Sequence, residues 1–118
     1  MNMKIVRGQV WKVNLDPTRG AEMKKLRPCV VVSADSIGKL PLKVIVPITE
    51  WKEIYASYPW IVKLEPNMQN GLDKLSAADA FQVKSLSTER FVKQLGVLSE
   101  EEIDDIVSAI GIVIQIPI

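Results

Sequence analysis

Side chains suited to phosphate chemistry gather in one segment near the start of this sequence. Arg19, Glu22, Lys24 and Arg27 lie close together before an apolar run, and Thr49 follows a later apolar run. Guanidinium and ammonium groups bind phosphate oxygens, while a carboxylate can accept a proton and a hydroxyl can donate a hydrogen bond. These residues form a candidate site if the ends of their strands meet. The plainer interpretation is a surface ion pair between Arg27 and Glu22, with Thr49 beginning a turn.

The sequence excludes several common kinds of active site. It contains no histidine, which removes histidine-based acid–base pairs and histidine-ligated metal sites. Its single cysteine, Cys29, rules out an internal disulfide and a thiolate zinc site, and its apolar surroundings predict a buried thiol. The acidic run from Glu100 to Asp105 suits a helix start better than a metal site, and there is no glycine-rich phosphate-binding motif. We therefore expect neither a metal nor a cofactor.

Charge is distributed unevenly along the chain, although its formal net charge is only +1. Residues 1–27 hold seven lysines and arginines against two acidic residues, a net charge of +5, which leaves −4 for the remainder. A basic face of this kind can meet the phosphates of a polyanion. Many proteins carry such a face for solubility alone, so the charge pattern leaves both interpretations open.

Short apolar runs bounded by turn residues predict a mostly β structure. The first strand is predicted at Gln9–Leu15, because Val and Trp favour strands and Asp16-Pro17 signals a turn. Further strands are predicted at Pro28–Ser33, Leu42–Ile48, Trp60–Leu64, Ala80–Lys84 and Gln94–Val97. Strands this short and close together favour a small barrel or a strongly bent sheet. The long polar and basic loop Asp16–Leu26 joins the first two strands and is a candidate functional loop.

The C-terminal segment changes to helical periodicity. Ser99 followed three residues later by Glu102 forms a capping-box pattern, and Pro117 marks the end of the predicted helix. Apolar residues recur at intervals of three and four, which places on one helical stripe Ile103, Ile106, Val107, Ile110, Val113 and Ile114. Together, the strands and this helix predict a β-rich α+β fold.

The length and composition fit one globular domain over residues 1–118. Hydrophobic residues make up 47% of the chain and charged residues 25%, and a chain of 118 residues lies within the common range for one domain. Met1–Gly8 has no apolar run that could act as a secretory signal, and no segment has the apolar length of a membrane helix. We therefore expect a cytoplasmic protein without a membrane partner.

Four stretches of the chain together resemble a known family. They are Gly8–Trp11, Leu15–Glu22, Arg27–Ser33 and Pro47–Thr49. The Asp-Pro-Thr-x-Gly-x-Glu loop, the Glu-x4-Arg-Pro step and the Pro-x-Thr strand end are similar in order and spacing to those of the MazF/PemK family of toxin ribonucleases. Looser matches extend the resemblance over nearly the whole chain, at Tyr58-Pro59, Gly71-Leu72, Gln82–Ser85 and Leu98-Ser99.

The resemblance implies a fold, an activity and partners. The implied fold is a small SH3-like barrel of the CcdB/MazF-like type with a C-terminal helix. The implied activity is sequence-specific, metal-independent cleavage of single-stranded mRNA without a cofactor, by a homodimer whose cognate antitoxin covers the active groove. By position, Arg27 and Thr49 correspond to the family's catalytic Arg and Thr, Glu22 to its active-site loop Glu, and Gln82 to an RNA-contacting Gln.

The chain departs from the family pattern at two positions. Cys29 replaces the usual Ala, and Glu50 follows Thr49 where the family often has a small or neutral residue. The carboxylate of Glu50 brings a negative charge close to the expected phosphate, which bears on the cleavage rate or on sequence preference.

The residue chemistry and the resemblance combine in one mechanism. The substrate's own 2′-hydroxyl attacks the adjacent phosphate, and the Arg27 guanidinium stabilises the developing negative charge. Glu22 is the expected proton acceptor, because the Arg27 guanidinium stays protonated at neutral pH and cannot take up another proton. Thr49 is expected to hydrogen-bond a phosphate oxygen through its hydroxyl.

Four further residues are the candidates for binding the RNA itself. Arg19 and Lys24 supply positive charge, and the resemblance assigns Gln82 a direct contact. Trp51 follows the predicted third strand and offers a ring on which a base can stack. For Trp11, which lies within a predicted strand, packing in the core is the preferred interpretation.

Two other classes of protein are consistent with parts of the sequence. Non-enzymatic toxins of the same fold poison DNA gyrase through the C-terminal helix, but this chain ends Gln115–Ile118 without an aromatic anchor. An SH3-like interaction module would use Tyr55, Tyr58 and Pro59 as a peptide groove. The Arg-Pro and Pro-x-Thr elements favour the nuclease over the gyrase poison.

Overall fold

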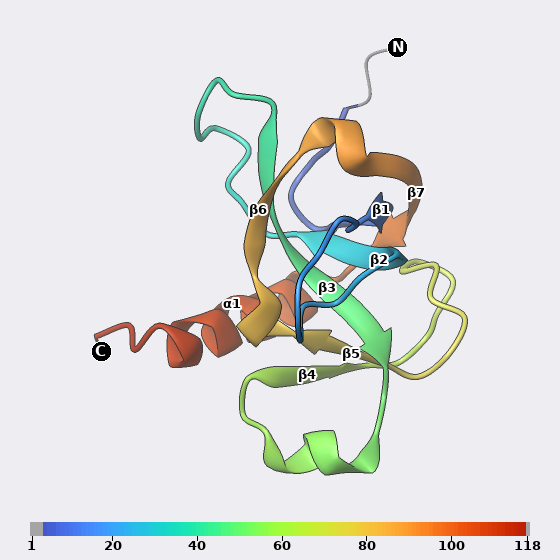
Figure 1. Ribbon diagram of the computed structural model, residues 1–118. Coiled ribbons are helices and arrows are strands. Elements are labelled where there is room, and N and C mark those ends of the chain that lie inside the picture. Colours follow the sequence, from blue (N-terminus) through green and yellow to red (C-terminus); the bar gives the residue numbers. More distant parts are fainter. Residues whose placement is uncertain (1–3, 118) are drawn as a thin grey trace.

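Seven strands and one C-terminal α-helix make up the structure, a computed structural model that describes residues 4–117 (Figure 1). The strands are β1 (Gln9–Asn14), β2 (Leu26–Val31), β3 (Leu42–Glu50), β4 (Ile61–Leu64), β5 (Ser76–Asp79), β6 (Lys84–Ser87) and β7 (Phe91–Val97). The helix α1 covers Glu100–Val113, and short 3-10 turns lie at Glu53–Ser57, Ala80–Gln82 and Thr88–Arg90. No helix within residues 4–117 has the length and apolar character needed to cross a membrane.

All strand pairs are antiparallel and follow the order β4-β5-β3-β2-β1-β7, with β6 paired to β3 outside this path. The expected mostly β fold with a C-terminal helix is confirmed. A closed barrel is not formed, because β4 and β7 remain as the edges of the sheet. The central strand β3 is the longest, and along one side it pairs first with β6 and then with β5.

The first three predicted strands are present. The second, β2, begins and ends two residues earlier than predicted, and the third, β3, is longer in a way that affects the site. Strand β3 continues to Glu50, so Thr49 lies within a strand and has Ala77 of β5 as its cross-strand partner. The predicted strand Ala80–Lys84 is wrong, since the strand lies earlier, at Ser76–Asp79. The strand ends at Asp79, whose carboxylate accepts a hydrogen bond from the Phe81 amide. This bond caps the 3-10 turn Ala80–Gln82 that follows.

The sheet buries a hydrophobic cluster on each of its two faces. Alternation along the strands separates them, because neighbouring residues of a strand point to opposite faces. Val30 and Val46 belong to the cluster beneath α1, which also includes Ile103 and Ile106 of the helix. The second cluster, on the other face, consists of Ile5, Trp11, Val13, Leu15, Cys29, Val31, Ile45, Leu86 and Phe91. Trp11 is therefore a core residue, as expected, and packs edge-on against Phe91 with ring centroids 5.8 Å apart.

The capping box predicted for the helix is confirmed. The Ser99 hydroxyl accepts from the Glu102 amide, and the Ser99 amide donates to the Glu102 carboxylate. The acidic residues Glu100 to Glu102 occupy the first turn, where the partial positive charge of the helix end stabilises carboxylates. The acidic run therefore lies at the start of a helix, as predicted.

The loop after β4 is held together by a buried side chain, and its backbone packs against β7. Asn70 is fully buried, and its amide accepts from the backbone of Asn67 and Leu72 and donates to the Glu65 carbonyl. The backbones come so close that a Cβ on Gly96 would lie 2.3 Å from the Gln69 carbonyl oxygen. This contact fixes the loop that forms one wall of the site.

The burial of Cys29 leads to a test of the core. Its thiol is 0% exposed, and burial raises its pKa to about 12, although Lys84 and Arg27 oppose the shift. The thiolate is the reactive form, so at pH 8 the native protein should react with a thiol reagent at least roughly a thousandfold more slowly than the unfolded chain. Absorbance of the released chromophore measures both rates. Equal rates in native buffer and in denaturant would contradict the packing described.

Candidate active site

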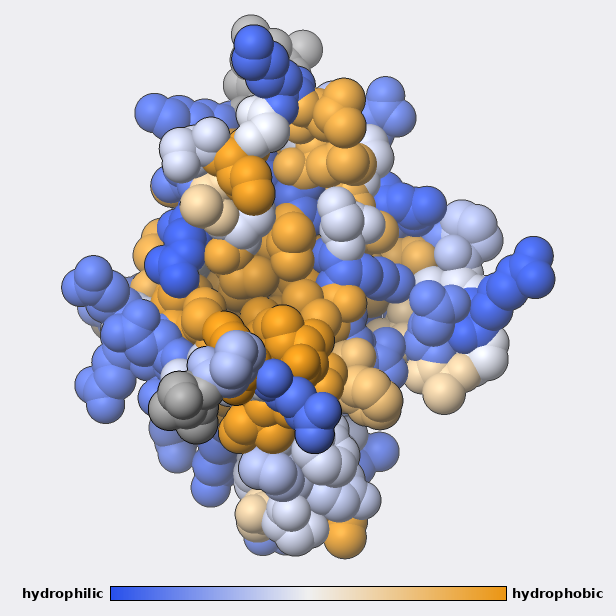
Figure 2. Space-filling view, turned by 90° about the vertical axis from the view of Figure 1, so that its left-hand side faces the viewer, coloured by the Kyte–Doolittle hydropathy of each residue, from blue (hydrophilic) through white to orange (hydrophobic). Residues whose placement is uncertain are grey.

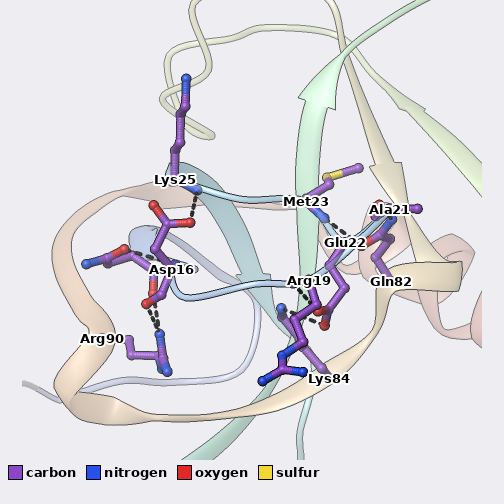
Figure 3. Close-up of polar contacts among 10 residues, drawn as sticks. Asp16, Arg19, Ala21, Glu22, Met23, Lys25, Gln82, Lys84 and Arg90 are labelled. Atoms are coloured by element: carbon purple, nitrogen blue, oxygen red, sulfur yellow. Dashed lines mark hydrogen bonds and ion pairs between the residues drawn. The ribbon is translucent and has the colours of Figure 1, made fainter.

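The loop between β1 and β2 is closed at its base by backbone hydrogen bonds. The Leu15 amide donates to the Lys25 carbonyl, and the Lys25 amide donates to the Asp16 carboxylate at 3.0 Å. Arg90, from the turn before β7, donates to the carbonyls of Asn14 and Asp16 from outside the loop (Figure 3). The basic and acidic side chains of the loop are thus carried on a fixed base.

Gln82 holds the middle of the same loop. Its side-chain oxygen accepts from the Met23 amide at 3.0 Å, and its side-chain nitrogen donates to the Ala21 carbonyl at 3.1 Å (Figure 3). Both ends of the amide are therefore used to bind backbone on either side of Glu22. In this structure the residue that the family resemblance assigns to RNA contact positions the active-site loop.

Glu22 lies at the tip of the loop and faces β6. Its carboxylate accepts from the Arg19 amide at 2.7 Å, and its other oxygen lies 3.9 Å from the Lys84 ammonium (Figure 3). The surface ion pair between Glu22 and Arg27, which the pattern alone favoured, is wrong, because Glu22 pairs with Lys84 instead. The side chain of Arg19 is exposed, as is that of Lys24.

Arg27 is held in place by two hydrogen bonds. Its Nε donates to the Lys24 carbonyl at 3.1 Å, and its Nη1 donates to the Thr49 hydroxyl at 3.3 Å. Strands β2 and β3 are antiparallel neighbours, with Cys29 opposite Pro47, which brings Arg27 beside Thr49. The Nη2 group of the half-buried guanidinium makes no hydrogen bond within residues 4–117. That group can therefore donate to an anion.

Arg27 and Thr49 stand between two hollows of the surface and line both. The loop-side hollow has a volume of about 410 Å³ and is also lined by Glu22, Lys24 and Gln82. The hollow on the other side has a volume of about 550 Å³ and is lined by polar and charged residues that include Lys12, Glu50, Lys52, Asp73 and Lys74. Lys52 lines both hollows. The pair thus occupies the middle of one polar groove, hereafter the groove.

Glu50, the acidic departure from the family pattern, has a partner in the groove. Its carboxylate lies 3.9 Å from the Lys74 ammonium, and both side chains are largely exposed. Such a pair has little net attraction in solvent, but the lysine offsets part of the negative charge beside Thr49.

Trp51 lies next to the groove and contacts three neighbouring side chains of the protein. Its indole nitrogen is 3.4 Å from the Glu53 carboxylate, the Lys63 ammonium lies 5.0 Å from its ring centroid, and its edge contacts Tyr55. Tyr55 itself lines the loop-side hollow. Tyr58 stacks on Trp60 with centroids 4.9 Å apart, so the proposed peptide groove is partly filled by this contact.

Asp79 is a further acidic residue of the loop-side hollow. Burial raises the pKa of its carboxyl above the usual range, and the hydrogen bond from the Phe81 amide opposes that shift. Asp79 is only half-buried, so its carboxylate can also meet a ligand that enters the hollow.

Lys52, Tyr55 and Asp79 line the loop-side hollow but were absent from the predicted site. Lys12, Asp73 and Lys74 of the other hollow were absent from it as well. Asp79 was missed because the strand that carries it was placed too late in the sequence, so its side of the sheet was unknown. Lys52 and Tyr55 lie in the segment after Thr49, from which the predicted site included only Trp51.

Comparisons with known proteins identify the family and the fold of the chain. A family model described as "PemK-like, MazF-like toxin of type II toxin-antitoxin system" matches residues 6–114. The chain is 36% identical over 103 residues to the endoribonuclease MazF9 of Mycobacterium tuberculosis, covering 82% of this chain and 85% of that protein.

Solved structures share the fold at lower sequence identity. MazF from Deinococcus radiodurans (Form-I) superposes with a TM-score of 0.81 at 22% identity, over 98% of this chain and 100% of that one. An endoribonuclease in complex with its cognate antitoxin, from a mycobacterial species, gives a TM-score of 0.77 at 19% identity, over 98% and 99% of the two chains. With the match over residues 6–114, this chain belongs to the PemK-like, MazF-like toxins of type II toxin–antitoxin systems.

Proposed function

We propose that this chain is a toxin endoribonuclease that cuts single-stranded RNA at short sequences, without a metal or a cofactor. The observation that carries the proposal is the Arg27 guanidinium, fixed by Lys24 and Thr49 in the middle of the groove, with its Nη2 group unpaired within residues 4–117. A fixed guanidinium is suited to the charge that develops on a phosphate during cleavage. The family and the endoribonuclease relative point to the same reaction.

In the proposed reaction the 2′-hydroxyl oxygen of the substrate forms a bond to the neighbouring phosphorus. The bond between phosphorus and the 5′-oxygen of the next nucleotide breaks, which leaves a cyclic 2′,3′-phosphate. The Glu22 carboxylate accepts the proton of the 2′-hydroxyl, and the leaving 5′-oxygen takes a proton from water. Arg27 and Thr49 donate hydrogen bonds to the phosphate oxygens and stabilise the added negative charge.

The two hollows extend the groove on either side of the scissile phosphate. Lysines line each of them, with Lys24 and Lys52 on the loop side and Lys12, Lys52 and Lys74 on the other. A single strand could therefore run through both hollows with its phosphates near these ammonium groups. Arg19 is exposed on the loop and adds positive charge at its rim.

The same proposal includes protein partners and a cellular setting. An antitoxin that covers the groove fits a relative solved with its cognate antitoxin. We take residues 1–118 as a single toxin domain that acts in the cytoplasm. We also propose a homodimer, because hydrophobic residues gather around the C-terminal end of α1 (Figure 2), where Ile112, Ile114 and Ile116 are 52%, 63% and 59% exposed.

The central prediction concerns Arg27. Replacing Arg27 with Ala should lower the cleavage rate roughly a hundredfold or more, the scale seen when a fixed oxyanion donor is removed. Arg27→Lys keeps the charge but loses the forked geometry, so it should recover only part of the rate. Cleavage of one labelled RNA measures the rates, and a thermal melt shows that each variant is folded. An Arg27→Ala protein that melts normally and cuts at the wild-type rate would rule out the site.

Two neighbouring variants separate chemistry from binding in the same assay. Thr49→Ala should lower the rate less than Arg27→Ala, because one of several donors to the phosphate is lost. Lys24→Ala should mainly weaken RNA binding and reduce its salt dependence. Lys93→Ala is the matched control, since Lys93 is exposed on β7 and lines neither hollow.

The second prediction addresses the nucleophile. Cleavage should continue in excess EDTA and should leave a cyclic 2′,3′-phosphate, since the attacking group belongs to the RNA. An RNA with a 2′-deoxy sugar at the cut position should resist cleavage, while the same change elsewhere in the strand should have little effect. Mass spectrometry of the products identifies the end group. Cleavage that needs added magnesium, or that cuts the 2′-deoxy strand, would disprove this mechanism.

The third prediction is the assembly state. Light scattering at micromolar concentration should give twice the 13.2 kDa mass of one chain. Ile114→Asp should shift the mass toward one chain, because a charge on the exposed end of α1 opposes its burial. A wild-type mass of 13.2 kDa under the same conditions would exclude the homodimer.

A further inference from the structure

We propose that Asp79 reads one nucleobase beside the scissile phosphate and selects a base that presents N–H donors, with guanine preferred and uracil disfavoured. The inference rests on the proposed RNA cleavage and adds the chemical class of nucleotide that the loop-side hollow accepts. Asp79 is then a specificity-determining residue, distinct in role from Arg27 and Thr49.

The strand register places Asp79 on the same face of the sheet as Thr49. Thr49 lies opposite Ala77 in the antiparallel pair of β3 and β5, so both side chains leave the same face. Asp79 follows Ala77 by two residues and therefore shares that face, about 6–7 Å further along the strand. That spacing is close to the distance between a phosphate and its own or a neighbouring base. Arg27, Thr49 and Asp79 accordingly line the same hollow of about 410 Å³.

The Asp79 carboxylate is fixed but only partly used. Its Oδ1 accepts from the Phe81 amide at 3.0 Å, which is its only hydrogen bond within residues 4–117. The two ion pairs of the described chain, Glu50 with Lys74 and Glu22 with Lys84, do not involve it. Burial disfavours its charged form, and the hydrogen bond from the Phe81 amide offsets that effect only in part. Donors from a bound ligand would supply what this carboxylate lacks.

The chemistry of a carboxylate identifies the part of RNA that it can meet. An ionised carboxylate only accepts hydrogen bonds and repels phosphate, so its partner must be a donor of the base or of the ribose. Guanine presents two adjacent N–H groups on its Watson–Crick edge, which match the two carboxylate oxygens. Cytosine and adenine each present one amino group. Uracil presents a single N–H between two carbonyl oxygens, which the carboxylate repels.

An aromatic wall completes the proposed base site. Tyr55 lines the same hollow and packs against Trp51 in a T-shaped pair, with ring centroids 5.9 Å apart and planes at 76°. An unpaired base that enters the hollow can lie against such a ring, and stacking of this kind tolerates any base. Tyr55 therefore supports binding, while Asp79 supplies the choice among bases.

The test compares cleavage of RNAs that differ at one base next to the cut position. The wild-type protein should cut the guanine RNA about tenfold or more faster than the uracil RNA, the scale of one paired base contact. Asp79→Asn should lose most of this ratio, because its amide replaces one of the two acceptor oxygens by an NH2 donor. The asparagine oxygen still accepts from the Phe81 amide, so its melting temperature should match the wild type. Asp105→Asn, exposed on α1, is the control and should keep the wild-type ratio.

A substrate change tests the same contact without altering the protein. Replacing that guanine by hypoxanthine removes the N2 amino group and keeps the N1 hydrogen, so the wild-type rate should fall several-fold. Asp79→Asn should cut both RNAs equally.

The outcomes separate this inference from the proposed function. If the wild type cuts RNA and Asp79→Asn has the same base preference, the inference is overturned and the cleavage proposal stands. An equal loss for all RNAs would assign Asp79 to the chemistry or to ribose binding and would also overturn it. A wild-type protein that cuts no RNA would overturn both.

Discussion

Strand β3 is the element on which the rest of the structure depends. It pairs with β2 along one side and with β6 and β5 in turn along the other. Its alternating side chains enter both hydrophobic clusters, with Val46 and Ile48 beneath α1 and Ile45 on the opposite face. The same strand carries Thr49 one residue before its end at Glu50, and the Thr49 hydroxyl accepts the hydrogen bond from Arg27. The position of the candidate catalytic pair is therefore set by the packing of the whole sheet.

The active-site loop gains its order from segments distant in sequence. Arg90 binds the base of the loop, and Gln82 binds its middle. Both come from the chain between β5 and β7, which also contains β6, a pairing partner of β3. Glu22 is thus held on one side by this chain, while Arg27 is held on the other by β3. The proposed proton acceptor, Glu22, and the proposed phosphate ligand, Arg27, are therefore held by different parts of the chain and are joined through the loop.

The sequence predicted those parts of the fold that depend on local signals. Ser99 and Glu102 specify the helix start through direct contact with each other, and the β-branched runs around Val30 and Val46 mark central strands. The β5 strand was not recognised, because its buried Ala77 and Ala78 have low strand propensity and owe their conformation to their neighbours. A sequence motif was enough to predict the site residues Arg27, Thr49 and Glu22. It did not predict which groups these residues contact. Only the structure shows that Glu22 meets Lys84, and that Gln82 binds the loop.

The way in which Gln82 holds the loop also bears on how such a protein can diversify. Both of its contacts are with backbone groups, the amide of Met23 and the carbonyl of Ala21. The side chain of Ala21 is exposed and takes no part in this attachment. Substitution at that position therefore leaves the scaffold of the loop intact while changing the surface presented to a ligand. Selection can act on the rim of the groove there with little effect on the hydrogen bonds that order the loop.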